Sequence, residues 1–111
     1  MSRSYVYQSL RGVVEPLLLF IIGELLPIHG YEIARELERR SQGYFTLTAS
    51  TLYSALRRLE RRGLVSSTWQ QISKQRRRCY ELTEKGHQIL AEELAQCQKF
   101  LGATERVIDS Q

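Results

Sequence analysis

The most apolar segment of the chain, residues 16–28 (PLLLFIIGELLPI), limits the folds open to it more than any other feature. A membrane span needs about 20 apolar residues, and this segment is shorter and contains Glu24. Only Arg3 and Arg11 precede it, and no cleavage site of small residues follows it, so it does not fit a secretory signal. We therefore expect a helix buried in the core or in a dimer interface of a cytoplasmic protein that has reduced cysteines and makes no membrane contact.

The composition excludes several functional classes. The chain has 111 residues, about one small domain, and 42% of them are hydrophobic and 25% charged. This balance is ordinary for a globular protein and argues against disorder. The two Cys and two His lack the spacing of metal ligands or of a disulfide framework. We find no phosphate-binding glycine loop, paired catalytic carboxylates or nucleophile motif, so we expect no enzyme, no metal and no cofactor.

Three helices are predicted in the first 62 residues. Residues 13–26 form an almost wholly apolar helix with Pro16 in its first turn, where the missing N–H of proline costs nothing. Residues 31–40 form an amphipathic helix whose expected inward residues are Tyr31, Ile33, Ala34 and Leu37. The third helix, residues 49–62, begins after an N-cap at Thr48 and ends before a C-cap at Gly63.

The third helix has two chemically distinct faces. Its apolar face consists of Leu52, Ala55, Leu56 and Leu59. The opposite face presents hydroxyls near its start and guanidiniums further along, from Ser50, Ser54, Arg57 and Arg61, with Thr51, Tyr53 and Arg58 on the flanks. Such a face can contact the base edges and phosphates of DNA.

Two strands are predicted to follow, over residues 64–71 and 77–82, because together they contain Val65, Thr68, Trp69 and Tyr80 between polar residues. The connecting residues 72–76 contain neither Gly nor Asn, which disfavours a tight two-residue turn. We therefore expect a longer, flexible connection. The loop and the second strand carry four basic residues: Lys74, Arg76, Arg77 and Arg78.

The last helix is predicted to begin after Thr83 and to continue to about residue 108. Its apolar residues recur at alternating spacings of four and three, with one polar position, in the series Leu90, Leu94, Cys97, Leu101, Thr104 and Ile108. Phe100 and Val107 widen this stripe. The pattern is typical of a coiled coil and predicts a homodimer. Cys97 fits a buried structural thiol better than the alternative, a redox switch.

The charge is concentrated in the middle of the chain. Residues 35–78 carry 11 Lys and Arg against three Glu, whereas the segments before and after them have net charges of −1 and −3. A basic centre favours a surface that binds a polyanion, although a solvated helix face would give the same count. Three helices followed by a ribbon are the parts of a winged helix-turn-helix, which inserts one helix into the major groove of DNA.

Three sequence segments resemble a known family, in the same order and spacing. These are HGYEIARELERR (29–40), TLYSALRRLERRGLV (51–65) and RRCYELTEKGHQIL (77–90). They are similar to the PadR-type transcriptional regulators, and the resemblance covers about residues 11–95. It implies a dimeric bacterial winged-helix protein, usually a repressor of detoxification or efflux genes. The single last helix resembles the short form of the family, in which this helix and the N-terminal helix build the dimer.

We therefore predict a mainly α protein with a small two-stranded β-ribbon, in which residues 1–83 form a winged helix-turn-helix and residues 84–111 a dimerisation helix. It would bind a palindromic operator in double-stranded DNA as a homodimeric repressor. A small-molecule effector of unknown identity is left open, as is the alternative of an architectural or protein-interaction module. The expected DNA-binding residues are Ser50, Thr51, Tyr53, Ser54, Arg57, Arg58, Arg61, Lys74, Arg76, Arg77 and Arg78. The expected dimerisation residues are Leu90, Leu94, Cys97, Phe100, Leu101 and Ile108.

Overall fold

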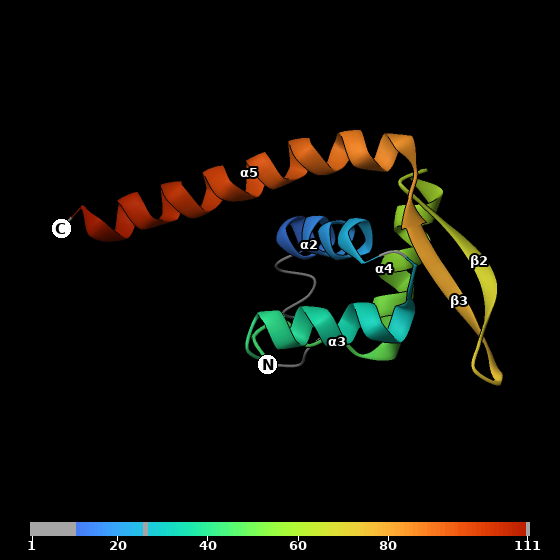
Figure 1. Ribbon diagram of the computed structural model, residues 1–111. Helices are drawn as coiled ribbons and strands as arrows, with labels where there is room; N and C mark the ends of the chain where they lie inside the picture. The colour runs from blue at the N-terminus through green and yellow to red at the C-terminus, as the bar shows by residue number, and fades with distance from the viewer. Residues whose placement is uncertain (1–10, 26, 111) are drawn as a thin grey trace.

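A computed structural model describes residues 11–25 and 27–110 of the protein. The elements follow in the order α2 (Arg11–Glu24), β1 (Ile28–His29), α3 (Gly30–Arg40), α4 (Ala49–Arg61), β2 (Val65–Ile72), β3 (Gln75–Leu82) and α5 (Glu84–Asp109). In Figure 1, α2 lies between α3 and α5, and the β2–β3 hairpin stands at the opposite end of the molecule from the C-terminus of α5. This is a winged helix-turn-helix with a long C-terminal helix, so the predicted fold class is confirmed.

The core is built around α2, as the apolar run in the sequence predicts. Its side chains Leu18, Leu19 and Ile22 are fully buried. Residues from α4 pack into the same cluster, and Leu56 and Leu59 are the most enclosed of the large ones. None of the helices in the described part of the chain combines the length and apolar character that a membrane span requires.

The prediction that Pro16 lies in the first turn of its helix is wrong, because α2 already begins at Arg11. An interior proline has no N–H to donate, so the carbonyl four residues earlier, that of Gly12, loses its usual helical partner. The thiol of Cys97 on α5 donates to this Gly12 oxygen at an S···O distance of 3.6 Å. The contact supplies part of the missing hydrogen bond and ties α5 to α2. The helix ends at Glu24, and Leu26, its predicted end, lies outside the described residues.

The sheet has three antiparallel strands in the order β1-β3-β2, one strand more than the predicted ribbon. The additional strand, β1, has only two residues, of which Ile28 pairs with Tyr80 of β3. Two residues are too few to show the alternation by which a strand is predicted from sequence. This short strand connects the start of α3 to the hairpin.

The prediction of a long connection between the two hairpin strands is wrong. Ile72 pairs with Gln75, so only Ser73 and Lys74 form the turn. Ser73 has a φ of +57°, and type II′ turns require a positive φ at this first position, where glycine is preferred. The ladder of paired residues therefore continues to the tip at the expense of an unfavourable backbone angle at Ser73. Arg76, which was predicted to lie in the loop, thereby becomes part of an ordered strand, whereas Lys74 lies in the turn.

Among the predicted inward residues of α3, Ile33 and Leu37 are buried and Ala34 is partly buried. The prediction that Tyr31 also faces inward is wrong, because 57% of its surface is exposed. The Arg35 guanidinium carbon lies 5.6 Å from the centre of its ring, so the ring packs against a charged neighbour on the surface.

Candidate nucleic-acid interface

A cleft of about 450 Å³ separates α4 from the β2–β3 hairpin. It is lined by four arginines, one glutamate and three aromatic residues, which are Tyr53, Arg57, Glu60, Trp69, Arg76, Arg77, Arg78 and Tyr80. The excess of positive charge makes this cleft a candidate site for a polyanion. Arg57 comes from α4 and Arg76, Arg77 and Arg78 from β3, so the fold brings together two sets of predicted DNA-binding residues.

The alternation of β3 explains how the hairpin contributes to the cleft. Side chains two residues apart in a strand lie on the same face. On one face of β3, Leu82 and Tyr80 are buried in the core, and Arg78 and Arg76 continue the same row beyond it. The face therefore changes from apolar to basic as the strand leaves the core, and it carries its arginines toward α4.

Trp69 organises these arginines, although it was not among the predicted site residues. It pairs with Arg78 across the hairpin, and its side chain is 56% exposed. The guanidinium carbons of Arg76 and Arg78 lie 5.2 and 5.7 Å from the centre of its ring, which is the geometry of a cation–π contact. The sequence shows only three consecutive arginines, residues 76–78, and the strand register is needed to tell which of them share a face with Trp69.

Glu60 connects α4 to the hairpin. Arg78 Nε donates to Ser67 Oγ at 2.9 Å, and Ser67 Oγ donates to Glu60 Oε2 at 3.1 Å. Arg78 Nη2 also lies 3.7 Å from the same carboxylate oxygen. This arrangement holds Arg78 toward α4 and leaves Arg76, nearer the tip, without a carboxylate contact among the ion pairs of the described residues.

The N-terminal turns of α4 present the predicted hydroxyl groups. Thr48 caps the helix by accepting a hydrogen bond from Thr51 N at 3.1 Å. Ser54 Oγ accepts a hydrogen bond from Arg57 Nη2 at 3.2 Å, so the guanidinium of Arg57 lies over this hydroxyl. Ser50 and Tyr53 are exposed, whereas Thr51 and Ser54 are half-buried.

Gly30 supports Tyr53 from the side of α3. A Cβ atom at Gly30 would lie 2.8 Å from both Cε1 and the hydroxyl oxygen of Tyr53, closer than real side chains come. The ring therefore packs on the glycine backbone. The absence of a side chain at residue 30 sets the position of the Tyr53 hydroxyl at the cleft.

Three predicted DNA-binding residues do not line the cleft. Arg58 is directed to the core side of α4, where its guanidinium binds the carboxylate of Glu15 on α2 at 2.9 Å. Arg61 is exposed at the end of α4, where a second depression joins it to Arg57. Lys74 is exposed in the turn at the hairpin tip. The structure thus places Arg58 in an internal ion pair and the other two residues at the margins of the cleft.

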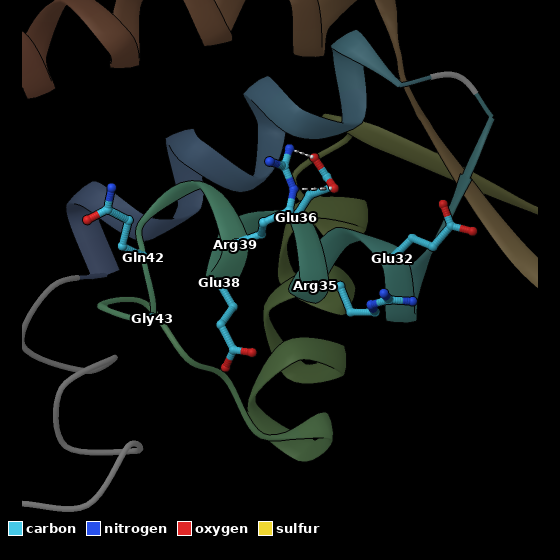
Figure 2. A pocket seen from close by; sticks show the side chains of 7 residues that line it. All are labelled: Glu32, Arg35, Glu36, Glu38, Arg39, Gln42 and Gly43. Atoms are coloured by element: carbon cyan, nitrogen blue, oxygen red, sulfur yellow. Dashed lines mark hydrogen bonds and ion pairs between the residues drawn. The ribbon is translucent and has the colours of Figure 1, made fainter.

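A further charged depression, about 590 Å³ in volume, lies on the outer face of α3 and is lined by Glu32, Arg35, Glu36, Glu38, Arg39, Gln42 and Gly43 (Figure 2). Figure 2 shows that the Arg39 guanidinium donates two hydrogen bonds to the Glu36 carboxylate, at 2.8 and 3.1 Å. Hydrogen bonds from Arg39 and Arg40 lower the pKa of Glu36 to about 2. Three carboxylates against two guanidiniums leave this surface unsuited to phosphate, so the α4–hairpin cleft is the better candidate.

The predicted dimerisation residues separate into two groups along α5. Leu90 packs against the core, Leu94 is half-buried, and Cys97 is buried against α2 of its own chain. Beyond Cys97 the helix extends past the rest of the protein, and its apolar side chains are exposed (Figure 1). Leu101 and Ile108 are 53% and 61% exposed, and Phe100 and Val107 widen the stripe.

Both cysteines are buried, free thiols. Burial is the main cause that raises the pKa of Cys79 and that of Cys97 above the ordinary value. A raised pKa keeps a thiol protonated at neutral pH, and a protonated thiol reacts slowly with oxidants. This favours the structural role for Cys97 that its contact with Gly12 already indicates.

The fold and the cleft define a winged helix-turn-helix protein with a basic surface beside α4. Residues 18–92 match the model of the family described as "Transcriptional regulator PadR-like family". The chain therefore belongs to the PadR-like family of transcriptional regulators, as its sequence motifs predicted.

Individual proteins are similar to this chain in sequence or in fold. An uncharacterised protein, "protein X" of Lysinibacillus sphaericus, is 30% identical over 84 residues, which are 75% of this chain and 76% of that protein. A PadR family regulator from Eggerthella lenta is 28% identical, with a TM-score of 0.78, over 97% of this chain and 92% of that one. The fold is also shared with Bacillus subtilis PadR in complex with operator DNA, at 23% identity and a TM-score of 0.64, over 74% of this chain and 46% of that one.

Proposed function

We propose that the protein is a homodimeric repressor that binds a palindromic DNA operator through the cleft between α4 and the β2–β3 hairpin. The observation that carries the proposal is the convergence of Arg57, Arg76, Arg77 and Arg78 on one cleft beside the exposed hydroxyl end of α4. In this proposal a small-molecule effector of unknown identity would act by lowering the affinity of the protein for its operator. The relative seen with operator DNA supports DNA as the partner.

Each part of the cleft has a separate role in this proposal. The N-terminal turns of α4 enter the major groove, where Ser50, Thr51, Tyr53 and Ser54 contact base edges. Arg57, Arg61 and the hairpin residues Lys74, Arg76, Arg77 and Arg78 contact phosphates, which position the protein without specifying sequence. Arg58 is left out, because its guanidinium is held by Glu15.

The salt dependence of binding tests the electrostatic part of the proposal. If each protomer neutralises about four phosphates, a dimer neutralises about eight, and log K against log[salt] should fall with a slope of roughly −7. Arg76→Ala removes two contacts per dimer and should flatten the slope by about 2, with similar losses for operator and random DNA. Fluorescence anisotropy with labelled duplexes at several salt concentrations measures both slopes.

Arg106→Ala provides the matched control, because Arg106 is an exposed arginine on the distal part of α5. It removes the same charge but should leave the slope unchanged. An equal flattening in both variants would mean that net charge, rather than the cleft, governs binding. A parent protein with equal affinity for every duplex would instead support the architectural alternative.

Gly30→Ala tests whether Tyr53 contacts bases. The new methyl group would displace the Tyr53 ring, because a Cβ at residue 30 would lie only 2.8 Å from the nearest ring atom. We expect operator affinity to fall about tenfold, since one base contact is worth about 1–3 kcal/mol, and affinity for random DNA to change little. The operator is first obtained by selecting bound sequences from random DNA, and competition binding gives the two affinities.

Gly12→Ala is the control for this variant, because a Cβ at Gly12 meets nothing within 4 Å. It should leave both affinities at the parental values. If Gly30→Ala weakens operator and random DNA by the same factor, Tyr53 is not positioned to recognise sequence.

A further inference from the structure

A chain of ion pairs joins the C-terminal half of α4 to both α2 and α5. Glu15 on α2, whose side chain is only 9% exposed, accepts hydrogen bonds from Arg58 Nη2 at 2.9 Å and Arg58 Nε at 3.1 Å. Its other carboxylate oxygen lies 3.6 Å from Arg62 Nη1. Arg62 Nη2 in turn donates to Glu93 Oε1 on α5 at 2.7 Å. We call these four residues the α4–α5 joint.

Hydrogen bonds to main-chain atoms fix the same end of α4 to the start of α5. Thr83 N donates to Leu64 O at 3.0 Å, and Thr83 Oγ1 donates to Gly63 O at 2.6 Å. Lys85 Nζ donates to Arg62 O at 3.0 Å. The C-terminal end of α4 is thus held rigidly, whereas its N-terminal end, with the hydroxyl groups, extends away from the joint.

The ion pairs define orientation more than they add stability. A buried ion pair is often no more stabilising than apolar residues of similar size, because desolvation of the charges offsets their attraction. Its hydrogen bonds are directional, however, and Arg58 and Arg62 lie one helical turn apart, where α2 and α5 hold them from two directions. This geometry restricts both the tilt of α4 and its rotation about its own axis.

We propose that the α4–α5 joint sets the angle between the DNA-contacting helix and the dimerisation helix and thereby selects the spacing of the two operator half-sites. The inference rests on the proposed dimeric DNA-binding function and adds a determinant of its specificity. Glu15 and Glu93 are positioning residues in this role, because they act on DNA only through Arg58 and Arg62.

The length of α4 makes half-site spacing sensitive to small changes at the joint. The hydroxyl end of α4 lies about ten residues from Arg62, which corresponds to about 15 Å of helix. A tilt of about 13° at the joint would therefore move this end by about 3.4 Å, the rise of one base pair. In a dimer the displacement occurs in both protomers, and each must still meet its own half-site.

The experiment measures the affinity of the full chain for a series of palindromes. Each contains the selected half-sites, with the centre shortened or lengthened by one or two base pairs. We expect the parent protein to have one optimal spacing. Glu93→Gln keeps the shape of the side chain but removes the charge partner of Arg62, and it should reduce the preference for the optimal spacing by about threefold to tenfold.

Glu92→Gln is the matched control, because Glu92 is the exposed neighbour of Glu93 on α5 and loses the same charge. It should retain the parental spacing preference. In the Arg62→Gln background, Glu93→Gln should change the preference no further, because the pair is already broken. Thermal denaturation and sedimentation velocity establish that each variant is folded and dimeric at the protein concentrations used.

The outcomes separate this inference from the function on which it rests. A parent protein without any optimal spacing would overturn the proposed dimeric operator binding. A sharp optimum that Glu93→Gln leaves intact would overturn the inference alone, and so would an equal loss in Glu93→Gln and Glu92→Gln. A flattened preference in folded, dimeric Glu93→Gln, absent from Glu92→Gln, would support it.

Discussion

The double variant Leu101→Glu/Ile108→Glu should be a folded monomer whose operator affinity is lower by roughly 10²–10⁴-fold, because two linked half-site contacts become one. Both side chains are more than half exposed on the extended part of α5, so their replacement leaves the core of the protomer intact. In the proposed dimer they face the partner, where buried carboxylates are strongly unfavourable. Sedimentation equilibrium gives the mass, and anisotropy gives the affinity.

Ala95→Glu/Gln98→Glu is the matched control for the dimer prediction. Both residues are exposed on the same helix but lie outside the apolar stripe, and the variant adds the same two charges. It should remain dimeric and retain operator affinity. A folded Leu101→Glu/Ile108→Glu protein that is still a dimer would place the interface elsewhere.

Gly86→Ala should destabilise the protein by about 3 kcal/mol or more, because the added methyl group would overlap a main-chain atom. A Cβ at Gly86 would lie far inside van der Waals contact with the carbonyl oxygen of Leu64, which also accepts the hydrogen bond from Thr83 N. Main-chain atoms at this junction cannot move without breaking the contact between α4 and α5. Urea denaturation followed by circular dichroism measures the change in the free energy of unfolding.

The same substitution at Gly102 has the opposite expected effect. A Cβ at Gly102 meets only the end of the flexible Arg106 side chain, at 3.3 Å. Alanine is favoured over glycine in a helix by about 1 kcal/mol, so Gly102→Ala should stabilise the protein slightly. If the two variants were equally stable, close packing at Gly86 would not be the reason for glycine there.

The local features of the helices could be predicted from the sequence alone. The apolar spacing of Leu52, Leu56 and Leu59 defined the buried face of α4. Thr48 and Thr83 cap α4 and α5 as predicted, since each accepts a hydrogen bond from a backbone N–H three residues later. These features depend on residues within one or two helical turns of one another, which is the range over which a sequence pattern is informative.

Part of the candidate site could be predicted as well, because the basic residues of α4 and β3 stand out in the sequence. The sequence could not show, however, which of these residues line the cleft and which bind a carboxylate. Arg57 faces the cleft, whereas Arg58, its neighbour, binds a carboxylate 43 residues earlier in the chain. The helical pattern put Arg57 on the polar face and Arg58 on the flank, but it could not show that a carboxylate of α2 lies beside this flank.

The residues alone were enough to predict the helices, the N-caps Thr48 and Thr83, the basic centre of the chain and the family. Three features appear only in the folded protein: the two-residue turn at Ser73, the packing of Trp69 against Arg76 and Arg78, and the thiol contact with the Gly12 carbonyl that Pro16 leaves unpaired. Each of these depends on a partner in another element, and strand register or helix packing, rather than local preference, determines which partner is within reach. For the same reason the α4–α5 joint, which connects residues 15, 58, 62 and 93, is visible only in the folded protein.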